Sequence, residues 1–170
     1  MKESLAIHFK KFKVNHFIIF TILCLIVLDL ISFVYLANTF KATLHSSSSL
    51  LWKLLSARFQ VSPSDLNPEF MREFAALMLN TIYLIVFVIF TNNVFFYTFF
   101  YKKKKWAFSY VSSYCFFGAL LNVFMIFDPN SMGVLWAFIN TAMVPAYLYF
   151  FLGLKFLKPE IIPVLEKKEL

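Results

Sequence analysis

The sequence predicts an all-α membrane protein, a four-helix transmembrane bundle with a short amphipathic helix in the loop after the first span. The chain is 61% hydrophobic and 21% aromatic, with only 3 glycines in 170 residues, so it is far more apolar than a soluble domain of this length. Four apolar runs reach the roughly 20 residues that a helix needs to cross a bilayer. The predicted spans are 16–38, 76–100, 106–127 and 133–157.

The positions of the basic residues predict the orientation of these spans. Residues 2–13, 102–105 and 155–168 hold 12 of the 16 Lys and Arg residues. Because cytoplasmic segments are enriched in Lys and Arg, both termini are predicted to be cytoplasmic, and the loop 39–75 to be lumenal or external. The net charge of +7 is thus interpreted as a topology signal, and no nucleic-acid partner is expected.

The first span runs from His16 to Asn38 and carries one acid, Asp29. An ionisable side chain is costly in hydrocarbon, so Asp29 needs either a partner or a function. The span follows a basic leader, residues 1–15, but it is too long for a signal-peptide core and ends without a convincing cleavage site. We therefore expect it to be retained.

The loop after the first span contains the segment Leu50–Phe59, LLWKLLSARF. Its apolar residues recur at helical spacing, which predicts a short helix lying in the membrane interface and anchored by Trp52. A packed loop helix of a larger complex is the alternative. The next helix is predicted to start at Asn67-Pro68-Glu69, which supplies an N-cap, a proline at the first helical position and an acid in the first turn.

The later spans contain a turn signal, a proline and no ligands for a metal. The third ends at Asp128-Pro129-Asn130, and the fourth contains Pro145. A proline inside a span kinks the helix and often marks where a cavity opens, although a tolerated kink against a neighbouring helix is the alternative.

Cys24 and Cys115 are interpreted as packing residues. All three histidines lie outside the apolar cores, so no metal, haem or other cofactor is expected.

Polar residues of the four spans are predicted to share one layer in the outer half of the bundle. Asp29, Asn122 and Asn140 lie about 6 to 8 residues, or roughly 9 to 12 Å, inside the outer ends of their spans. Tyr83 lies at a similar level in the second span. These groups are candidate partners for Asp29 and a candidate ligand site. Holding the helices together is the alternative role for such amides.

The chain ends in Lys167-Lys168-Glu169-Leu170. Lysines three and four positions from a cytoplasmic terminus, within the tail 158–170, form the dilysine pattern of a retrieval signal for the endoplasmic reticulum. The alternative is a chance match, for example in a bacterial inner-membrane protein.

Five segments together resemble the EXPERA family of four-span reticulum proteins, most closely its sigma-2-receptor-like members and more distantly the emopamil-binding sterol isomerases. The segments are IVLDLISF, LLWKLLSARF, PEFMREF, KKWAFSYVSSY and VPAYLYFF. The resemblance implies a cavity that opens sideways to the lipid in the half of the bundle away from the cytoplasm, with Asp29 as the acid that grips a sterol or amine. Pro145 and Tyr147 of the VPAYLYFF segment are further candidate ligand-binding residues. The second acid of the family is missing, because Val61 or Ser62 stands in its place.

The glutamate that the family has in its second span is also missing, because Met78 and Asn80 stand there instead. Moving a sterol double bond requires both a proton donor and a proton acceptor. The sequence therefore favours binding over catalysis.

Three functions remain open on the sequence. The first is a membrane protein that binds a sterol or other lipid in an intramembrane cavity. The second is a non-catalytic subunit or scaffold that docks another membrane protein or a second copy of the chain. The third is a small cation-coupled transporter that uses Asp29, which 3 glycines and the absence of discontinuous spans disfavour.

Overall fold

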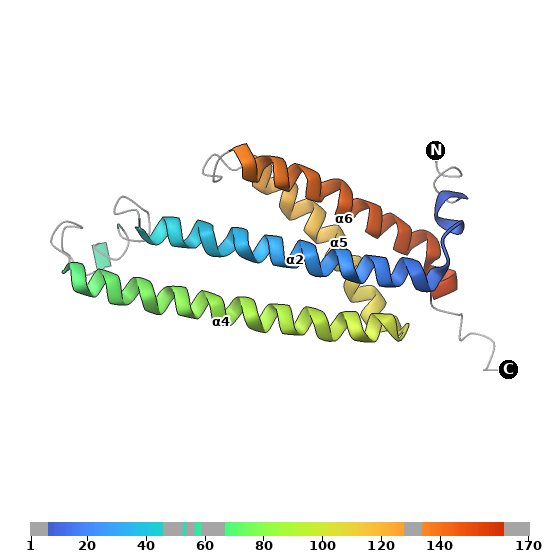
Figure 1. Ribbon diagram of the computed structural model, residues 1–170, viewed down its shortest axis with the longest axis horizontal. Helices are drawn as coiled ribbons and strands as arrows, with labels where there is room; N and C mark the ends of the chain where they lie inside the picture. Colours follow the sequence, from blue (N-terminus) through green and yellow to red (C-terminus); the bar gives the residue numbers. More distant parts are fainter. Residues whose placement is uncertain (1–6, 46–52, 54–56, 59–66, 128–133, 162–170) are drawn as a thin grey trace. The chain divides into compact units, whose positions relative to one another are not determined.

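The computed structural model describes residues 7–45, 53, 57–58, 67–127 and 134–161. Four long helices follow one another in this part of the chain (Figure 1). They are α2 (Val14–His45), α4 (Pro68–Tyr101), α5 (Lys105–Ile126) and α6 (Val134–Ile161). All four are long and apolar enough to cross a membrane, and the described residues contain no strand. The predicted all-α membrane fold is confirmed.

The helices extend beyond the predicted spans. α2 continues through residues 39–45 and α4 already begins at Pro68, so both ends of the predicted loop 39–75 are helical. α6 continues to Ile161, inside the predicted tail. Most of the predicted loop helix, Leu50–Phe59, lies outside the described residues, although its described members Lys53, Ala57 and Arg58 are helical.

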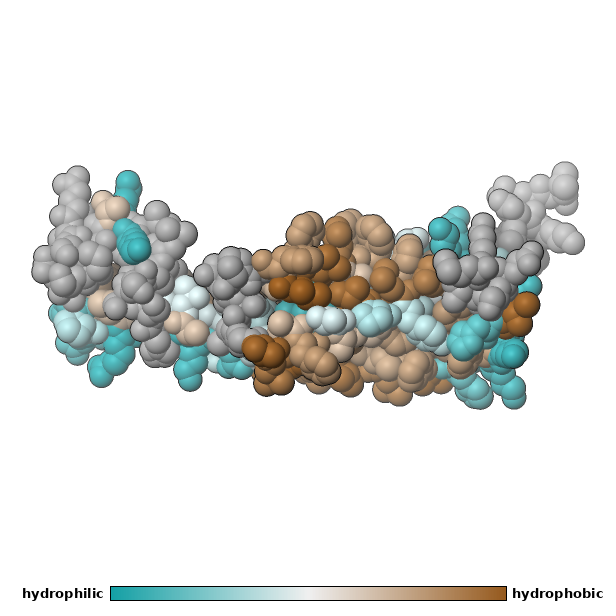
Figure 2. Space-filling model, turned by 90° about the horizontal axis from the view of Figure 1, so that it is seen from above, coloured by the Kyte–Doolittle hydropathy of each residue, from teal (hydrophilic) through white to brown (hydrophobic). Residues whose placement is uncertain are grey.

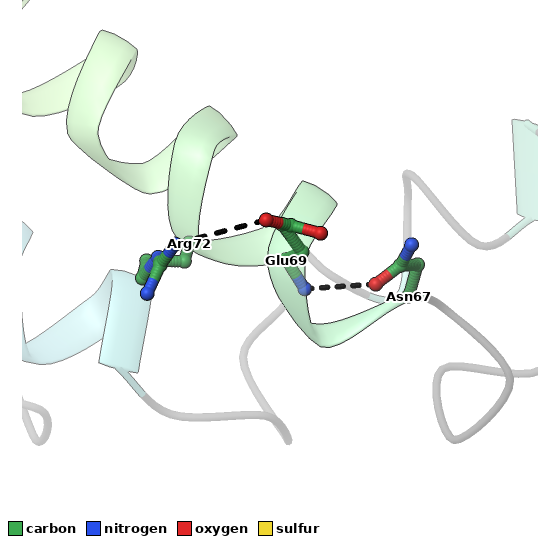
Figure 3. Close-up of polar contacts among 3 residues, drawn as sticks. All are labelled: Asn67, Glu69 and Arg72. Carbon is green, nitrogen blue, oxygen red and sulfur yellow. Dashed lines mark hydrogen bonds and ion pairs between the residues drawn. The ribbon is translucent and has the colours of Figure 1, made fainter.

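The start of α4 lies where the sequence predicts it (Figure 3). The backbone N–H of Glu69 donates to Oδ1 of Asn67 at 2.9 Å, so the asparagine side chain caps the helix. The Arg72 guanidinium lies 3.9 Å from the Glu69 carboxylate in an exposed i,i+3 pair, which contributes little stability. The predicted cap is confirmed, and the helix runs without interruption to Tyr101.

The chain divides into two compact units, residues 1–28 with 92–170 and residues 29–91. In the second unit, the rings of Phe33 on α2 and Phe90 on α4 meet edge to face at 5.9 Å. The first unit contains α5, α6 and one end each of α2 and α4. It also contains the groove described below.

α5 and α6 lie side by side and antiparallel in the first unit (Figure 1). The buried residues of α6 recur alternately three and four positions apart, which is the spacing of a left-handed coiled coil. They include Asn140, Met143, Tyr147, Phe150, Leu154, Leu157 and Ile161. Opposite them α5 buries mainly small side chains, such as Val111, Cys115 and Ala119, so the two backbones can approach closely.

A tight turn joins α4 to α5 inside the first unit. Lys103 adopts a left-handed conformation with φ 57°, and its N–H donates to the Phe100 carbonyl at 2.8 Å. Tyr110 of α5 donates to Oδ1 of Asn93 on α4 at 2.5 Å and stacks on Phe96, with ring centroids 3.7 Å apart. A polar and an aromatic contact thus fasten the two helices near their connection.

The first turns of α2 pack against the last turns of α6 around Gly153. A Cβ at this glycine would lie 2.3 Å from Cζ of Phe17 and 2.8 Å from Cε1 of Phe9. Both phenylalanines are 1% exposed, so neither ring has free space into which it could move. One turn away, Phe20 meets Phe150 at 5.8 Å. The absence of a side chain at Gly153 therefore permits this contact between helices.

We expect Gly153→Ala to destabilise the protein. Overpacking costs about 1 to 3 kcal/mol, and the better helix propensity of alanine returns up to about 1 kcal/mol. The free energy of unfolding in detergent should fall by about 1 to 2 kcal/mol on this balance. The double variant Gly153→Ala with Phe17→Leu should lose less than the sum of the two single variants, because the shorter side chain relieves the closer of the two contacts. Strictly additive losses would contradict this account of the contact.

Candidate functional site: an apolar groove between α2 and α6

A groove of about 730 Å³ lies between the first half of α2 and α6. Its volume is within the range of about 300 to 1,000 Å³ that is typical of small-molecule sites. All of its lining residues belong to the first compact unit. They are Phe12, Phe20, Leu23, Cys24, Val27, Leu28, Ala146, Tyr149 and Phe150.

The groove exists because small side chains follow a pair of large ones. Phe20 on α2 and Phe150 on α6 touch each other and hold the two helices apart. One turn further along each antiparallel helix, the side chains are those of Cys24 and Ala146, which are too small to fill the space between the helices. Ala146 directly follows Pro145, the position where the sequence suggests a cavity.

The groove is lined almost wholly by apolar side chains, and it is open along one side. Leu23 and Val27 are 58% and 54% exposed along its rim. Hydrophobic side chains cover much of the described surface in the view of Figure 2. Since such a surface faces lipid in a membrane, a molecule could enter the groove laterally from the bilayer without crossing water.

A polar pair, His8 and Tyr149, lies beside the groove. Residues 7–10 form a helical turn before α2 and fold back on the first unit. Phe9 of this turn packs between Phe17 and Phe156, with ring centroids 5.9 Å from each. His8 lies 5.4 Å from the ring of Phe12, and its Nε2 is hydrogen-bonded to the Tyr149 hydroxyl at 3.3 Å. Phe12 and Tyr149 both line the groove, so the pair lies at its edge.

Asp29 and Tyr83, two of the predicted site residues, belong to the second compact unit. Asp29 is fully buried, on the stripe of α2 that also carries Phe17, Thr21 and Leu25 at intervals of four residues. Tyr83 is 51% exposed on α4. Neither lines the groove.

The other predicted site residues belong to the first unit and also lie outside the groove lining. Asn122 is buried and donates to the Gly118 carbonyl of its own helix at 2.8 Å. Asn140 is buried, and within the described residues its Nδ2 has no hydrogen-bond partner. Tyr147 is buried against α5, whereas Pro145 is exposed. That all four helices contribute to one polar layer stays a prediction, because its members belong to two units.

The residues that form the groove are not distinguished by the sequence. They are ordinary apolar residues in helices that are apolar on every side, so no single position stands out. A usable signal was the large-to-small spacing of Phe20 with Cys24 and of Phe150 with Ala146, one helical turn apart on two antiparallel spans.

In the described part of the chain, no three His, Cys, Asp or Glu side chains are grouped so that they could hold a metal ion. Comparison with protein-family models found no matching family. Comparisons with curated proteins and with solved structures found no match either. The EXPERA resemblance therefore stays a prediction, and Lys167 and Lys168 of the predicted retrieval signal lie outside the described residues.

The two cysteines provide an internal test of this geometry. Cys24 lines the groove and is partly exposed, whereas Cys115 is fully buried between α5 and α6. In detergent, N-ethylmaleimide should alkylate Cys24 at least about tenfold faster than Cys115, because a buried structural thiol is inert. Mass spectrometry of the two peptides over time measures both rates in one sample. Equal rates would contradict the described packing.

Proposed function

We propose that this protein is a membrane protein of the endoplasmic reticulum that binds a sterol or another lipid-like molecule in the groove between α2 and α6. The apolar groove of about 730 Å³ is the observation that carries the proposal. Its volume suits a small ligand, and its lining of aromatic and aliphatic side chains suits an apolar body. The reticulum location depends on the dilysine pattern at Lys167 and Lys168.

The side opening supports a ligand that is dissolved in the bilayer. A water-soluble ligand would have to leave water and cross the interface before it reached Leu23 or Val27, which are exposed along the rim. A lipid already resides beside them. The resemblance of the sequence to the EXPERA family points to the same class of ligand and to a cavity that opens toward the lipid, but it implies that the cavity lies at Asp29, which is not part of this groove.

Binding without catalysis is the form of this function that the lining favours. None of the nine lining residues is His, Asp, Glu or Lys, the side chains that most often transfer protons in enzymes. The sequence also lacks the second acid and the second-span glutamate of the resembled isomerases. We therefore propose a carrier, sensor or receptor of lipid.

Filling the groove tests the proposal. The protein is reconstituted in lipid nanodiscs, and capture of a photoreactive cholesterol analogue is measured by gel after irradiation. Cys24→Trp places an indole in the groove and should reduce capture at least about fivefold, because the ligand loses the volume it would occupy. The matched control is Ile19→Trp, which adds the same side chain to an exposed position of α2 outside the groove.

Thermal unfolding of both tryptophan variants accompanies the capture assay. Capture that is lost in Cys24→Trp and retained in Ile19→Trp, at similar stability, supports the groove. Equal capture by both variants and the wild type would contradict it.

Asp29→Asn distinguishes the groove from the site predicted from the sequence. Asp29 is buried and lies outside the groove lining, so capture of the photoreactive sterol should stay within about twofold of the wild type while folding is retained. Gel quantification after irradiation measures this. Loss of capture by a folded Asp29→Asn variant would place the site at the acid instead.

A scaffold is the second candidate, because α4 presents large apolar side chains along one long stretch. In residues 77–88 these include Leu77, Leu84, Phe87 and Val88, which are 57% to 66% exposed. Another membrane protein or a second copy of the chain could pack there. Retention of sterol capture after groove filling would leave this candidate as the stronger one.

A further inference from the structure

We infer that the groove holds an acyl chain of an anionic phospholipid, and that Lys10, Lys11 and Lys13 hold the head group of this lipid at the end where α2 begins. This inference rests on the proposed function, since it names the class of lipid that the same groove would bind. It also gives a role in binding to residues 7–13, in which the sequence indicates only a basic leader.

Residues 7–13 bring lysines to one end of the groove. Phe12 lines the groove, and its neighbours in the chain are Lys11 and Lys13. Phe9, which is 1% exposed, fastens this segment to the first unit. The lysines themselves are exposed. Their charges therefore lie beside the apolar groove and remain available to a molecule from outside the protein.

The first compact unit has a strong excess of positive charge. Its described residues include one acid, Glu160, and nine lysines, which are Lys10, Lys11, Lys13, Lys102, Lys103, Lys104, Lys105, Lys155 and Lys158. Within the described residues, no ion pair joins any of these lysines to Glu160. Clustered lysines beside a membrane span attract the head groups of anionic lipids.

The positions of the lysines and of the groove along α2 match the two parts of such a lipid. The lining residues Phe20 to Leu28 lie roughly 10 to 22 Å beyond Lys13, at 1.5 Å per residue. The hydrocarbon core of a bilayer is about 30 Å thick, so this is the depth of an acyl chain whose head group lies at the level of the lysines.

The lining and the lysines favour a phospholipid over a sterol. None of the nine lining residues is Lys, Arg, Asp or Glu, so the groove itself suits only the apolar part of a ligand. A sterol has no charge with which the lysines could interact. A phosphate spreads its negative charge over several oxygens, and lysine is a common phosphate ligand.

The experiment compares two photoreactive phospholipids that have the same diazirine acyl chain, one with a serine and one with a choline head group. The full chain is reconstituted in phosphatidylcholine nanodiscs, where both leaflets are alike and the orientation of the protein does not affect capture. The wild type should capture the serine lipid at least about fivefold better, the value of one lysine near an anionic head group. The labelled peptides should contain Cys24 or Ala146, which line the groove.

A triple variant tests the head-group contact. Lys10→Gln, Lys11→Gln and Lys13→Gln together should reduce the preference for the serine lipid to about twofold or less and leave capture of the choline lipid unchanged. The matched control removes the same charge from the connection between α4 and α5, with Lys102→Gln, Lys104→Gln and Lys105→Gln. It should keep the preference, because these lysines are not next to a lining residue in the chain.

Thermal unfolding of both triple variants accompanies the capture assay. If the first triple variant does not fold, the single variant Lys11→Glu tests the same contact and should reduce the preference at least about twofold.

Orientation of the spans is the competing explanation for the lysines of residues 7–13. It requires positive charge on one side of the membrane, but no lysine at the groove. In that case the two triple variants would behave alike. Equal losses in both variants, or a wild type that does not discriminate between serine and choline lipids, would overturn the inference.

The outcomes separate the inference from the proposed function. If Cys24→Trp lowers capture of both lipids while the first triple variant keeps the preference, the groove binds lipid and the head-group assignment is wrong. If Cys24→Trp changes the capture of neither lipid, the proposed function fails. Unlabelled cholesterol or oleic acid that displaces the serine lipid better than unlabelled phosphatidylserine does would overturn the assignment of the lipid class.

Discussion

A polar side chain in a helix that faces hydrocarbon has no water to bond, and the rest of this structure depends on that constraint. The polar residues avoid the lipid, or bond their own helix, in two ways. Thr21, Asp29, Asn93, Asn122 and Asn140 are buried. The exposed threonines of the spans instead donate to the carbonyl four residues earlier, as Thr91 does to Phe87 and Thr141 does to Ala137. Large apolar side chains such as Phe87 and Phe138 are left outside, 66% and 72% exposed. The outward faces of these helices are therefore apolar, unlike those of a water-soluble bundle.

Helices that gain nothing from burying apolar area must associate through close packing. Gly118 lies under the ring of Tyr147, and Gly153 lies under the rings of Phe9 and Phe17, so large rings fill the space that small residues leave. Between Cys24 and Ala146 no ring fills that space, and a groove remains. The same rule that holds α2, α5 and α6 together therefore explains the groove as a place where a small residue on one helix lacks a large one opposite. A lipid-like ligand would supply the missing packing.

The sequence was sufficient for the fold class and for individual helix ends, because these depend on local composition. The cap at Asn67 is an example, since its side chain bonds a residue two positions away. The direction in which each helix faces was harder to predict. α2 is apolar on all sides, so only its polar residues mark the inner face: Thr21 and Asp29 are eight residues apart and both buried. The fold-back of residues 7–10 could not be predicted, because it depends on Phe9 reaching Phe17 and Phe156, and Phe156 is 147 positions away in the chain.

This packing also changes how the acid in the first span is interpreted. From the sequence, Asp29 is the natural ligand contact, because a carboxylate in hydrocarbon calls for a cation or a hydroxyl. In the structure its side chain is buried on the inner stripe of α2, while the groove lies beside Phe20, Cys24 and Val27 of the same helix. Polar groups of the protein can offset the cost of removing a buried acid from water, so such an acid does not require a ligand. The surface that the groove presents to a molecule arriving from the bilayer is then that of its apolar lining side chains, which contact an apolar body through close packing.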